Sequence, residues 1–175
     1  MNVQAFFQEE GKQQIIEKHE HVFMQGDDDD HIYLVQSGLL KAYYVSADGR
    51  ENIKSFILPG DTIGSLSAAY QHSSCSFNLL ALQNTQLTKL SFKRLFEAAK
   101  QSQDLANKLI EILLSLAMKK ERREYELLCM PAEERYRNLW SSTPELFEAV
   151  TQNDIARYLG ITPVALSRIK KRVGF

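Results

Sequence analysis

The chain has 175 residues, of which 44% are hydrophobic and 25% charged. This composition excludes a largely disordered, collagen-like or disulfide-scaffold protein. The 21 lysines and arginines nearly balance 22 aspartates and glutamates, so the net charge of −1 indicates no partner. No apolar run approaches the roughly 20 residues that span a bilayer. With two cysteines and no leader-like N-terminus, we expect a cytoplasmic protein without a membrane span.

The charge is distributed unevenly along the chain. Residues 1–116 hold 10 basic and 14 acidic side chains, net −4, whereas residues 117–175 hold 11 and 8, net +3. Within the last 25 residues a single acidic side chain, Asp154, stands against five basic ones: Arg157, Arg168, Lys170, Lys171 and Arg172. Such a basic end is either a solvated helical face or a surface that binds nucleic acid.

Residues 22–91 have the pattern of a β module. Gly26, Gly38, Gly49 and Gly60 recur at intervals of 11 or 12 residues, with short apolar or alternating runs between them. This spacing indicates an all-β sandwich or barrel. Asp48 before Gly49 suits a tight hairpin turn, because both residues tolerate positive φ. We expect strands over 32–35, 39–45, 53–58, 77–82 and 86–90.

A long helix is predicted from about Ser102, because apolar residues recur at spacings of 3 and 4 and no Gly or Pro intervenes before Pro131. A helix that is apolar on two sides needs two partners. We expect one row to cover the β module and the other to meet the same helix of a second copy; the alternative is a helix buried within one chain. The row assigned to the dimer interface is Leu105, Leu109, Ile112 and Leu116. The parallel row is Ala106, Ile110, Leu113 and Ala117.

Residues 151–173 carry the signals of a helix-turn-helix. Thr151 and Asp154 have the spacing of a capping box, in which the carboxylate reaches back to the start of the helix. Gly160 suits the left-handed residue that ends this helix, and Thr162 can cap a second helix with Pro163 at its first position. The shared core is expected to hold Ile155, Ala156, Leu159, Ile161, Leu166 and Ile169. The alternative is an ordinary pair of packed helices.

The second helix is predicted to read base edges in the major groove of DNA. Arg168 can donate two hydrogen bonds to a guanine, and Val164 or Ala165 can contact a thymine methyl group. The lysines further along this helix are better suited to phosphates, which supply affinity without sequence choice. The full set of predicted DNA contacts is Thr151, Gln152, Thr162, Val164, Ala165, Ser167, Arg168, Lys170, Lys171 and Arg172.

Three segments carry a family resemblance: IYLVQSG at 32–38, FILPGDTIG at 56–64 and TQNDIARYLGITPVALSRI at 151–169. Together they resemble the CRP/FNR family of bacterial transcription factors, named after the cyclic AMP receptor protein and the fumarate–nitrate reduction regulator. The resemblance implies an α+β chain: a jelly-roll sensor module similar to a cyclic-nucleotide-binding domain (1–101), a dimerisation helix (102–130) and a winged-helix-like DNA-binding domain (131–175) whose wing, at 143–150, is reduced.

The same resemblance implies a homodimer that reads a palindromic site in double-stranded DNA. RNA polymerase is a further possible partner. Ser167 and Arg168 match the Ser-Arg pair that is common in the recognition helix of the family. Val164 departs from it, because many members have Glu at that position. The half-site sequence therefore does not carry over.

The effector of the family's cyclic-AMP-binding members cannot be assigned to this chain either. Members that bind cyclic AMP have Gly-Glu-Leu and an Arg-Ser or Arg-Thr pair, where this chain has Gly64-Ser65-Leu66 and Cys75-Ser76. Without the Glu and the Arg, a cyclic phosphate loses its main partners. Two cysteines also cannot supply the four ligands that an iron–sulfur cluster normally takes. We expect no cofactor, and a small-molecule effector other than cyclic AMP in a pocket formed by Gly64, Ser65, Leu66, Cys75 and Ser76.

Two alternatives of other classes stay open at this point. His19 and His21 could chelate a metal from one face of a strand, as in cupin enzymes, although no carboxylate follows where cupins have one. His72 and Cys75 could similarly ligate zinc or haem. A dimeric signalling module that binds a ligand without DNA is the other alternative. Since no nucleophile–base pair, phosphate-binding loop or paired-carboxylate motif stands out, we expect no enzymatic activity.

Overall fold

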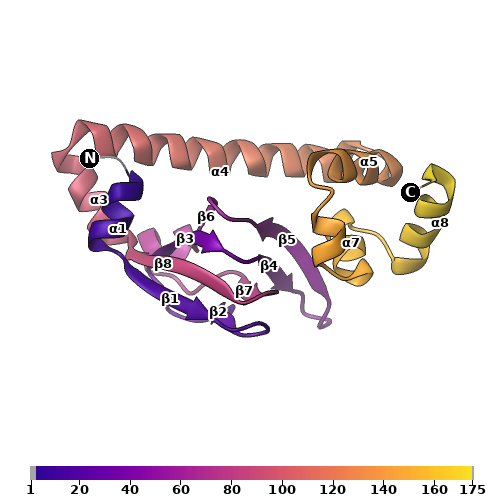
Figure 1. Ribbon diagram of the computed structural model, residues 1–175, viewed down its shortest axis with the longest axis horizontal. Coiled ribbons are helices and arrows are strands. Elements are labelled where there is room, and N and C mark those ends of the chain that lie inside the picture. The colour runs from indigo at the N-terminus through magenta and orange to yellow at the C-terminus, as the bar shows by residue number, and fades with distance from the viewer. Residues whose placement is uncertain (1–2, 175) are drawn as a thin grey trace.

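The computed structural model describes residues 3–174. Its N-terminal part is a β roll of eight strands with three short helices around it (Figure 1). The strands are β1 (Lys12–Ile16), β2 (His21–Phe23), β3 (His31–Ser37), β4 (Leu40–Val45), β5 (Glu51–Ile57), β6 (Thr62–Ile63), β7 (Asn78–Ala81) and β8 (Thr85–Ser91). The helices of this part are α1 (Val3–Glu10), α2 (Leu66–Gln71) and α3 (Phe92–Gln101).

The roll consists of two four-stranded sheets, ordered β1-β8-β3-β6 and β2-β7-β4-β5. All the pairings between the described strands are antiparallel. The predicted hairpin turn is confirmed: Gly49 has φ +79°, and its N–H donates to the carbonyl of Ser46 at 2.8 Å. Side chains from both sheets, including Phe23 and Tyr33, fill the space between them together with Phe77, which precedes β7. The jelly-roll prediction therefore holds.

The remaining helices follow the roll in the chain. They are α4 (Gln103–Cys129), α5 (Ala132–Ser142), α6 (Leu146–Ala149), α7 (Gln152–Leu159) and α8 (Pro163–Val173). Helix α4 extends along one side of the roll (Figure 1). Helices α5 to α8, which we call the head, lie at the C-terminal end of α4. Between α5 and α7 the described chain forms the short helix α6 and no strand, so residues 143–150 carry no β wing. None of the described helices is long and apolar enough to cross a membrane.

The long helix has the two apolar rows that its sequence predicts, but the row assigned to the dimer interface packs inside the same chain, as do Ala106 and Leu113 of the other row. Leu105 is only 2% exposed and Leu109 is buried with it, packed against α1, α3, β3 and β8 in the core of the same chain. Ile112 is partly buried against the same cluster, and Leu116 is half-buried. The row predicted to face a second copy therefore covers the roll, because the roll and α3 lie on that side of the helix.

A different stripe on α4 is left uncovered. It begins at Ile110, a member of the row that was expected to cover the roll, and it ends at Leu128, which is 76% exposed. Spacings of 3, 4 and 7 keep its members on one side of the helix. The exposed stripe consists of Ile110, Leu114, Met118, Tyr125 and Leu128.

The head has its own core, which continues into the roll. Tyr136 of α5, Ile155 of α7 and Leu166 of α8 are buried together. Leu39, just before β4, belongs to the same cluster, and Phe56 of β5 packs against it. The head therefore rests on the β4–β5 side of the roll through apolar side chains.

Candidate nucleic-acid interface

Local capping signals form the first helix of the head. The Thr151 hydroxyl oxygen accepts from the backbone N–H of Asp154 at 3.1 Å, which satisfies one of the free amides at the start of α7. The carboxylate of Asp154 does not bond back to the Thr151 amide, as a capping box would have it. It accepts from the Thr151 hydroxyl at 2.7 Å and from a side chain of the roll. The predicted start of the helix is correct, but the predicted bond from the Asp154 carboxylate back to the start of the helix is replaced by these two contacts.

The turn between α7 and α8 follows the predicted pattern. Gly160 has φ +67°, and the N–H of Ile161 donates to the carbonyl of Ala156 at 3.0 Å, as in a Schellman motif. The Thr162 hydroxyl oxygen then accepts from the N–H of Ala165 at 3.2 Å and caps α8, with Pro163 at the first helical position. These short-range contacts fix the angle between the two helices.

We predict that Gly160→Ala destabilises the fold by about 1–2 kcal/mol, because an L-residue in the left-handed region is strained. The added methyl group would also lie 3.3 Å from Cδ2 of Leu127. Urea denaturation of both proteins measures the difference. Gly49→Ala is the matched control for space, since its φ of +79° is close to that of Gly160 but a Cβ there meets nothing within 4 Å. Equal losses in the two variants would show that the Leu127 contact has no effect.

Helix α8 presents one face to solvent. Val164, 61% exposed, leads this face, and Ser167, Arg168 and Lys171 follow at helical spacing. Leu166 and Ile169 on the opposite side are buried against α7. Arg168 has no hydrogen-bond or ion-pair partner among the described residues, so its guanidinium is available. The predicted base-reading side chains thus share one exposed face.

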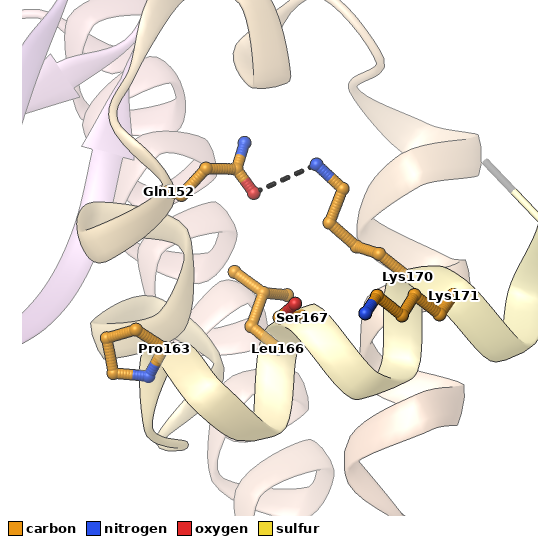
Figure 2. A pocket seen from close by; sticks show the side chains of 6 residues that line it. All are labelled: Gln152, Pro163, Leu166, Ser167, Lys170 and Lys171. Atoms are coloured by element: carbon orange, nitrogen blue, oxygen red, sulfur yellow. Dashed lines mark hydrogen bonds between the residues drawn. The ribbon is translucent and has the colours of Figure 1, made fainter.

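An open hollow lies beside this face, between the start of α7 and α8 (Figure 2). The Lys170 ammonium donates to the side-chain carbonyl of Gln152 at 3.1 Å, across the mouth of the hollow. Its lining consists of Gln152, Pro163, Leu166, Ser167, Lys170 and Lys171. Two ammonium groups and a hydroxyl at one rim have the chemistry to bind a phosphate of a nucleic-acid backbone.

The remaining predicted contacts divide into two groups. Thr151 and Thr162 are exposed at the starts of α7 and α8, although their hydroxyls are engaged in capping, and Ala165 is half-buried. Arg172 is directed away from the reading face, because its Nε lies 3.1 Å from a carboxylate oxygen of Glu133 on α5. Arg172 is therefore less available to a phosphate than Lys171.

Two arginines that sequence reasoning missed hold the helix-turn-helix against the end of α4. Arg123 of α4 donates to the carbonyl of Tyr158, and its guanidinium lies 3.9 Å from the centroid of the Tyr158 ring. Burial lowers the pKa of Arg123. Arg135 of α5 donates to the carbonyl of Leu159 at 2.9 Å. Both bonds satisfy carbonyls at the C-terminus of α7, where cations are favoured, but nothing local in the sequence marks these partners.

The residues predicted for an effector pocket do not share one surface. Ser65 and Cys75 are 2% exposed in the interior of the roll, whereas Leu66 and Ser76 are exposed. Burial raises the pKa of the Cys75 thiol. A Cβ on Gly64 would lie 2.7 Å from the carbonyl oxygen of His31, so the backbone is closely packed there. Between the segments 64–66 and 75–76, only the side chains of Ser65 and Cys75 are brought together.

The geometry assumed for a histidine chelate is also absent. His19 has φ +73° and lies in a turn rather than on a strand, and Nε2 of His21 is hydrogen-bonded to the Tyr43 hydroxyl at 2.9 Å. His72 is exposed while Cys75 is buried. Within residues 3–174, no three His, Cys, Asp or Glu side chains are grouped so that they could hold a metal ion.

Comparison with known proteins places this arrangement in a family. The cyclic nucleotide-binding domain family matches residues 13–102. Regulatory protein HlyX of Actinobacillus pleuropneumoniae is 30% identical over 90% of this chain and 69% of its own length. The anaerobic regulatory protein of Haemophilus influenzae is 32% identical over 90% of this chain and 65% of its own. The chain belongs to the CRP/FNR family of transcription regulators, and it spans about two thirds of the length of these relatives.

Solved structures of regulators share the fold. FixK2 from Bradyrhizobium japonicum superposes with a TM-score of 0.81 at 22% identity, over 94% of this chain and 84% of that one. The c-di-GMP-responsive regulator CLP of Xanthomonas campestris gives 0.77 at 19% identity, over 98% and 90%. These structures confirm the predicted combination of a β roll with C-terminal helices, and the relatives above confirm the predicted family.

Proposed function

We propose that this chain is a sequence-specific DNA-binding transcription regulator whose α8 enters the major groove. The observation that carries the proposal is the exposed face of α8, where Val164, Ser167 and Arg168 project from a helix fixed by two caps and a left-handed turn. Side chains of this kind read base edges, and the relatives at 30% identity and above are regulatory proteins. We propose that the protein acts in the cytoplasm and catalyses no reaction. Its contact with RNA polymerase would decide whether it activates or represses transcription.

Lys170 and Lys171 are proposed to contact phosphates. Each neutralised phosphate releases counterions, so log K falls linearly with log salt concentration. Fluorescence anisotropy of a labelled duplex over a range of salt concentrations tests this, and Lys171→Ala should lower the slope by roughly 1. Lys108→Ala, on the far part of α4, is the matched control. A wild-type affinity that does not depend on salt would contradict a phosphate-contacting α8.

The chain is proposed to act as a homodimer through the exposed stripe of α4. Apolar side chains at helical spacing along a helix are covered when two such helices pack side by side. Because α8 lies at the C-terminal end of α4 (Figure 1), a symmetric pair of α4 helices would carry two reading helices at one end of the dimer. Such a pair suits a palindromic DNA site.

We propose that the effector of this regulator, a small molecule, is not cyclic AMP. Ser65 and Cys75 stand where cyclic-AMP-binding members have their acid and their arginine, and both are buried and uncharged in the roll. A cyclic phosphate would find no guanidinium to neutralise it. Isothermal titration calorimetry should detect no binding at micromolar cyclic AMP. Heat of binding at that concentration, lost in a Ser76→Ala variant, would contradict the assignment.

A further inference from the structure

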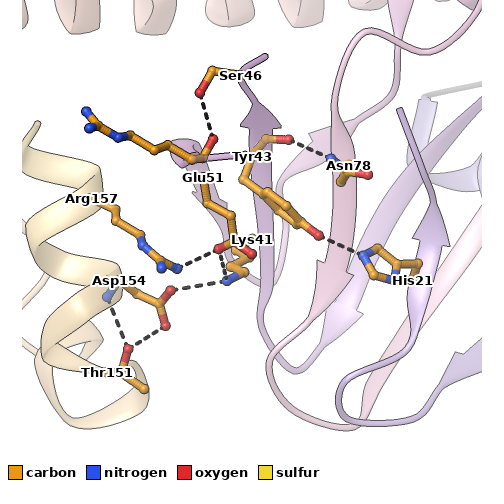
Figure 3. A network of polar contacts seen from close by, with 10 residues as sticks. His21, Lys41, Tyr43, Ser46, Glu51, Asn78, Thr151, Asp154 and Arg157 are labelled. Atoms are coloured by element: carbon orange, nitrogen blue, oxygen red, sulfur yellow. Dashed lines mark hydrogen bonds and ion pairs between the residues drawn. The ribbon is translucent and has the colours of Figure 1, made fainter. Parts of the chain in front are cut away.

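A network of charged side chains joins the head to the roll (Figure 3). The ammonium of Lys41 on β4 lies 3.1 Å from Oδ1 of Asp154 on α7 and 3.3 Å from Oε2 of Glu51 on β5. Nη1 of Arg157, also on α7, lies 2.6 Å from the same Glu51 oxygen. Lys41 and Asp154 are 7% and 6% exposed, so water has little access to this cation–carboxylate pair.

Because the Lys41–Asp154 pair is buried, it stabilises only the arrangement of the head in which both partners are in place. A buried charge is tolerated when its partner is in place, and separating the two leaves each uncompensated in a poorly solvated site. If the head moved away from the roll, Lys41 would lose Asp154, and Glu51 would lose Arg157. The network therefore favours a single position of α7 on the β4–β5 hairpin.

Apolar and backbone contacts surround the same joint. The ring of Phe56 on β5 lies 5.3 Å from that of Tyr158 on α7, centroid to centroid. From the other side, Arg123 of α4 and Arg135 of α5 bond the carbonyls of Tyr158 and Leu159. Helix α7 thus contacts the roll, the long helix and α8 at once. Because α8 packs on α7, its position follows that of α7.

The network holds the head without covering the reading face. With the pair closed, Val164, Ser167 and Arg168 remain exposed, so the contact does not mask DNA-binding side chains. Two reading helices of a dimer must meet grooves about one helical turn apart, roughly 34 Å. Heads that are already fixed lose less conformational freedom on binding than heads that swing.

We propose that the Lys41–Asp154 pair, supported by Glu51 and Arg157, is a latch that sets the position of the reading helix, and that it stays closed in the DNA complex. The proposal rests on the DNA-binding function proposed above.

Lysine acetylation read by mass spectrometry tests the latch in the full chain without DNA. We expect Lys41 to react at least roughly tenfold more slowly than the exposed Lys108, because it is buried and paired. The double variant Glu51→Gln/Asp154→Asn should raise the Lys41 rate several-fold. Glu111→Gln is the matched control, since it removes the carboxylate 2.6 Å from Lys108 and so measures the chemical effect of losing a partner. A Lys41 rate that rises no more than this control, or one that is already high in the wild type, overturns the latch.

The same measurement on the DNA complex separates this inference from the proposed function. With duplexes enriched from a random pool, Lys170 and Lys171 should become protected, and Lys41 should stay protected. Failure to protect Lys170 and Lys171 contradicts DNA binding by α8 itself. Their protection together with a newly reactive Lys41 shows that the latch opens on DNA and overturns the inference. Asp154→Asn should weaken binding of the enriched duplex by roughly tenfold; equal or tighter binding would also overturn it.

Discussion

Leu114→Glu is expected to convert the protein from a dimer to a monomer. Leu114 lies in the middle of the exposed stripe of α4 and is itself exposed in the single chain. In a symmetric pair of helices this change would place two carboxylates in an apolar interface, where an unpaired charge is strongly disfavoured. Light scattering after size-exclusion chromatography should give 20.1 kDa for the variant and twice that mass for the wild type.

The control for this prediction changes the charge elsewhere on the same helix. Lys108→Glu puts the same carboxylate about a third of a turn away from the stripe and should leave the dimer intact. Loss of the dimer should also weaken binding to a two-half-site duplex by roughly 100-fold or more, since the second half-site is no longer bound within one complex. A dimeric Leu114→Glu variant would show that another surface joins the two copies.

Arg168→Ala is expected to reduce discrimination between the preferred and non-specific duplexes by roughly 5- to 150-fold, or about 1–3 kcal/mol. Arg168 is exposed on the reading face and is unpaired within the described chain, so it is free to donate two hydrogen bonds to a guanine edge. Competition titrations with specific and random duplexes at one salt concentration measure the ratio directly. The stability of the protein should not change, because Arg168 packs against nothing in the head core.

Lys171→Ala serves as the comparison for Arg168→Ala. Both variants remove one exposed positive charge from α8, but a phosphate contact carries no sequence information. Lys171→Ala should therefore weaken specific and random binding alike and leave their ratio unchanged. If Arg168→Ala behaved in the same way as Lys171→Ala, Arg168 would be a phosphate contact and another side chain would read the bases.

The helix-turn-helix could be predicted closely because its signals are local. Thr151, Gly160, Thr162 and Pro163 each act within a few residues of the backbone that they shape. Most strands were predicted for the same reason, since alternation and turn residues lie side by side in the chain. Elements that are too short to show a period were missed, such as β6 and α2. Helix α3 was missed although Ser91 caps it and Phe92, Leu95 and Ala99 follow at helical spacing.

Features that depend on distant partners could not be predicted. Periodicity showed two apolar rows on α4, but the position of the roll and α3 decides which residues of each row are buried. Leu105, assigned to the dimer interface, lies in the core of its own chain. Asp154 looked like a capping residue, whereas its carboxylate also pairs with Lys41, 113 residues earlier in the chain. Arg172 stays a predicted phosphate contact, but its exposed ion pair with Glu133 of α5 could not be read from the local sequence. In each case a contact between separate elements adds to what the local pattern shows.

Selection of bound duplexes from a random pool, followed by sequencing, tests the central claim most directly. A dimer that reads DNA through two copies of α8 should enrich a two-fold symmetric motif whose half-sites are centred about 10 base pairs apart. The same selection with Arg168→Ala should lose preference at one position in each half-site and keep the spacing. No enrichment over the input pool, or an asymmetric motif that Arg168→Ala leaves unchanged, would contradict the account of α8 as the reading helix of a dimer.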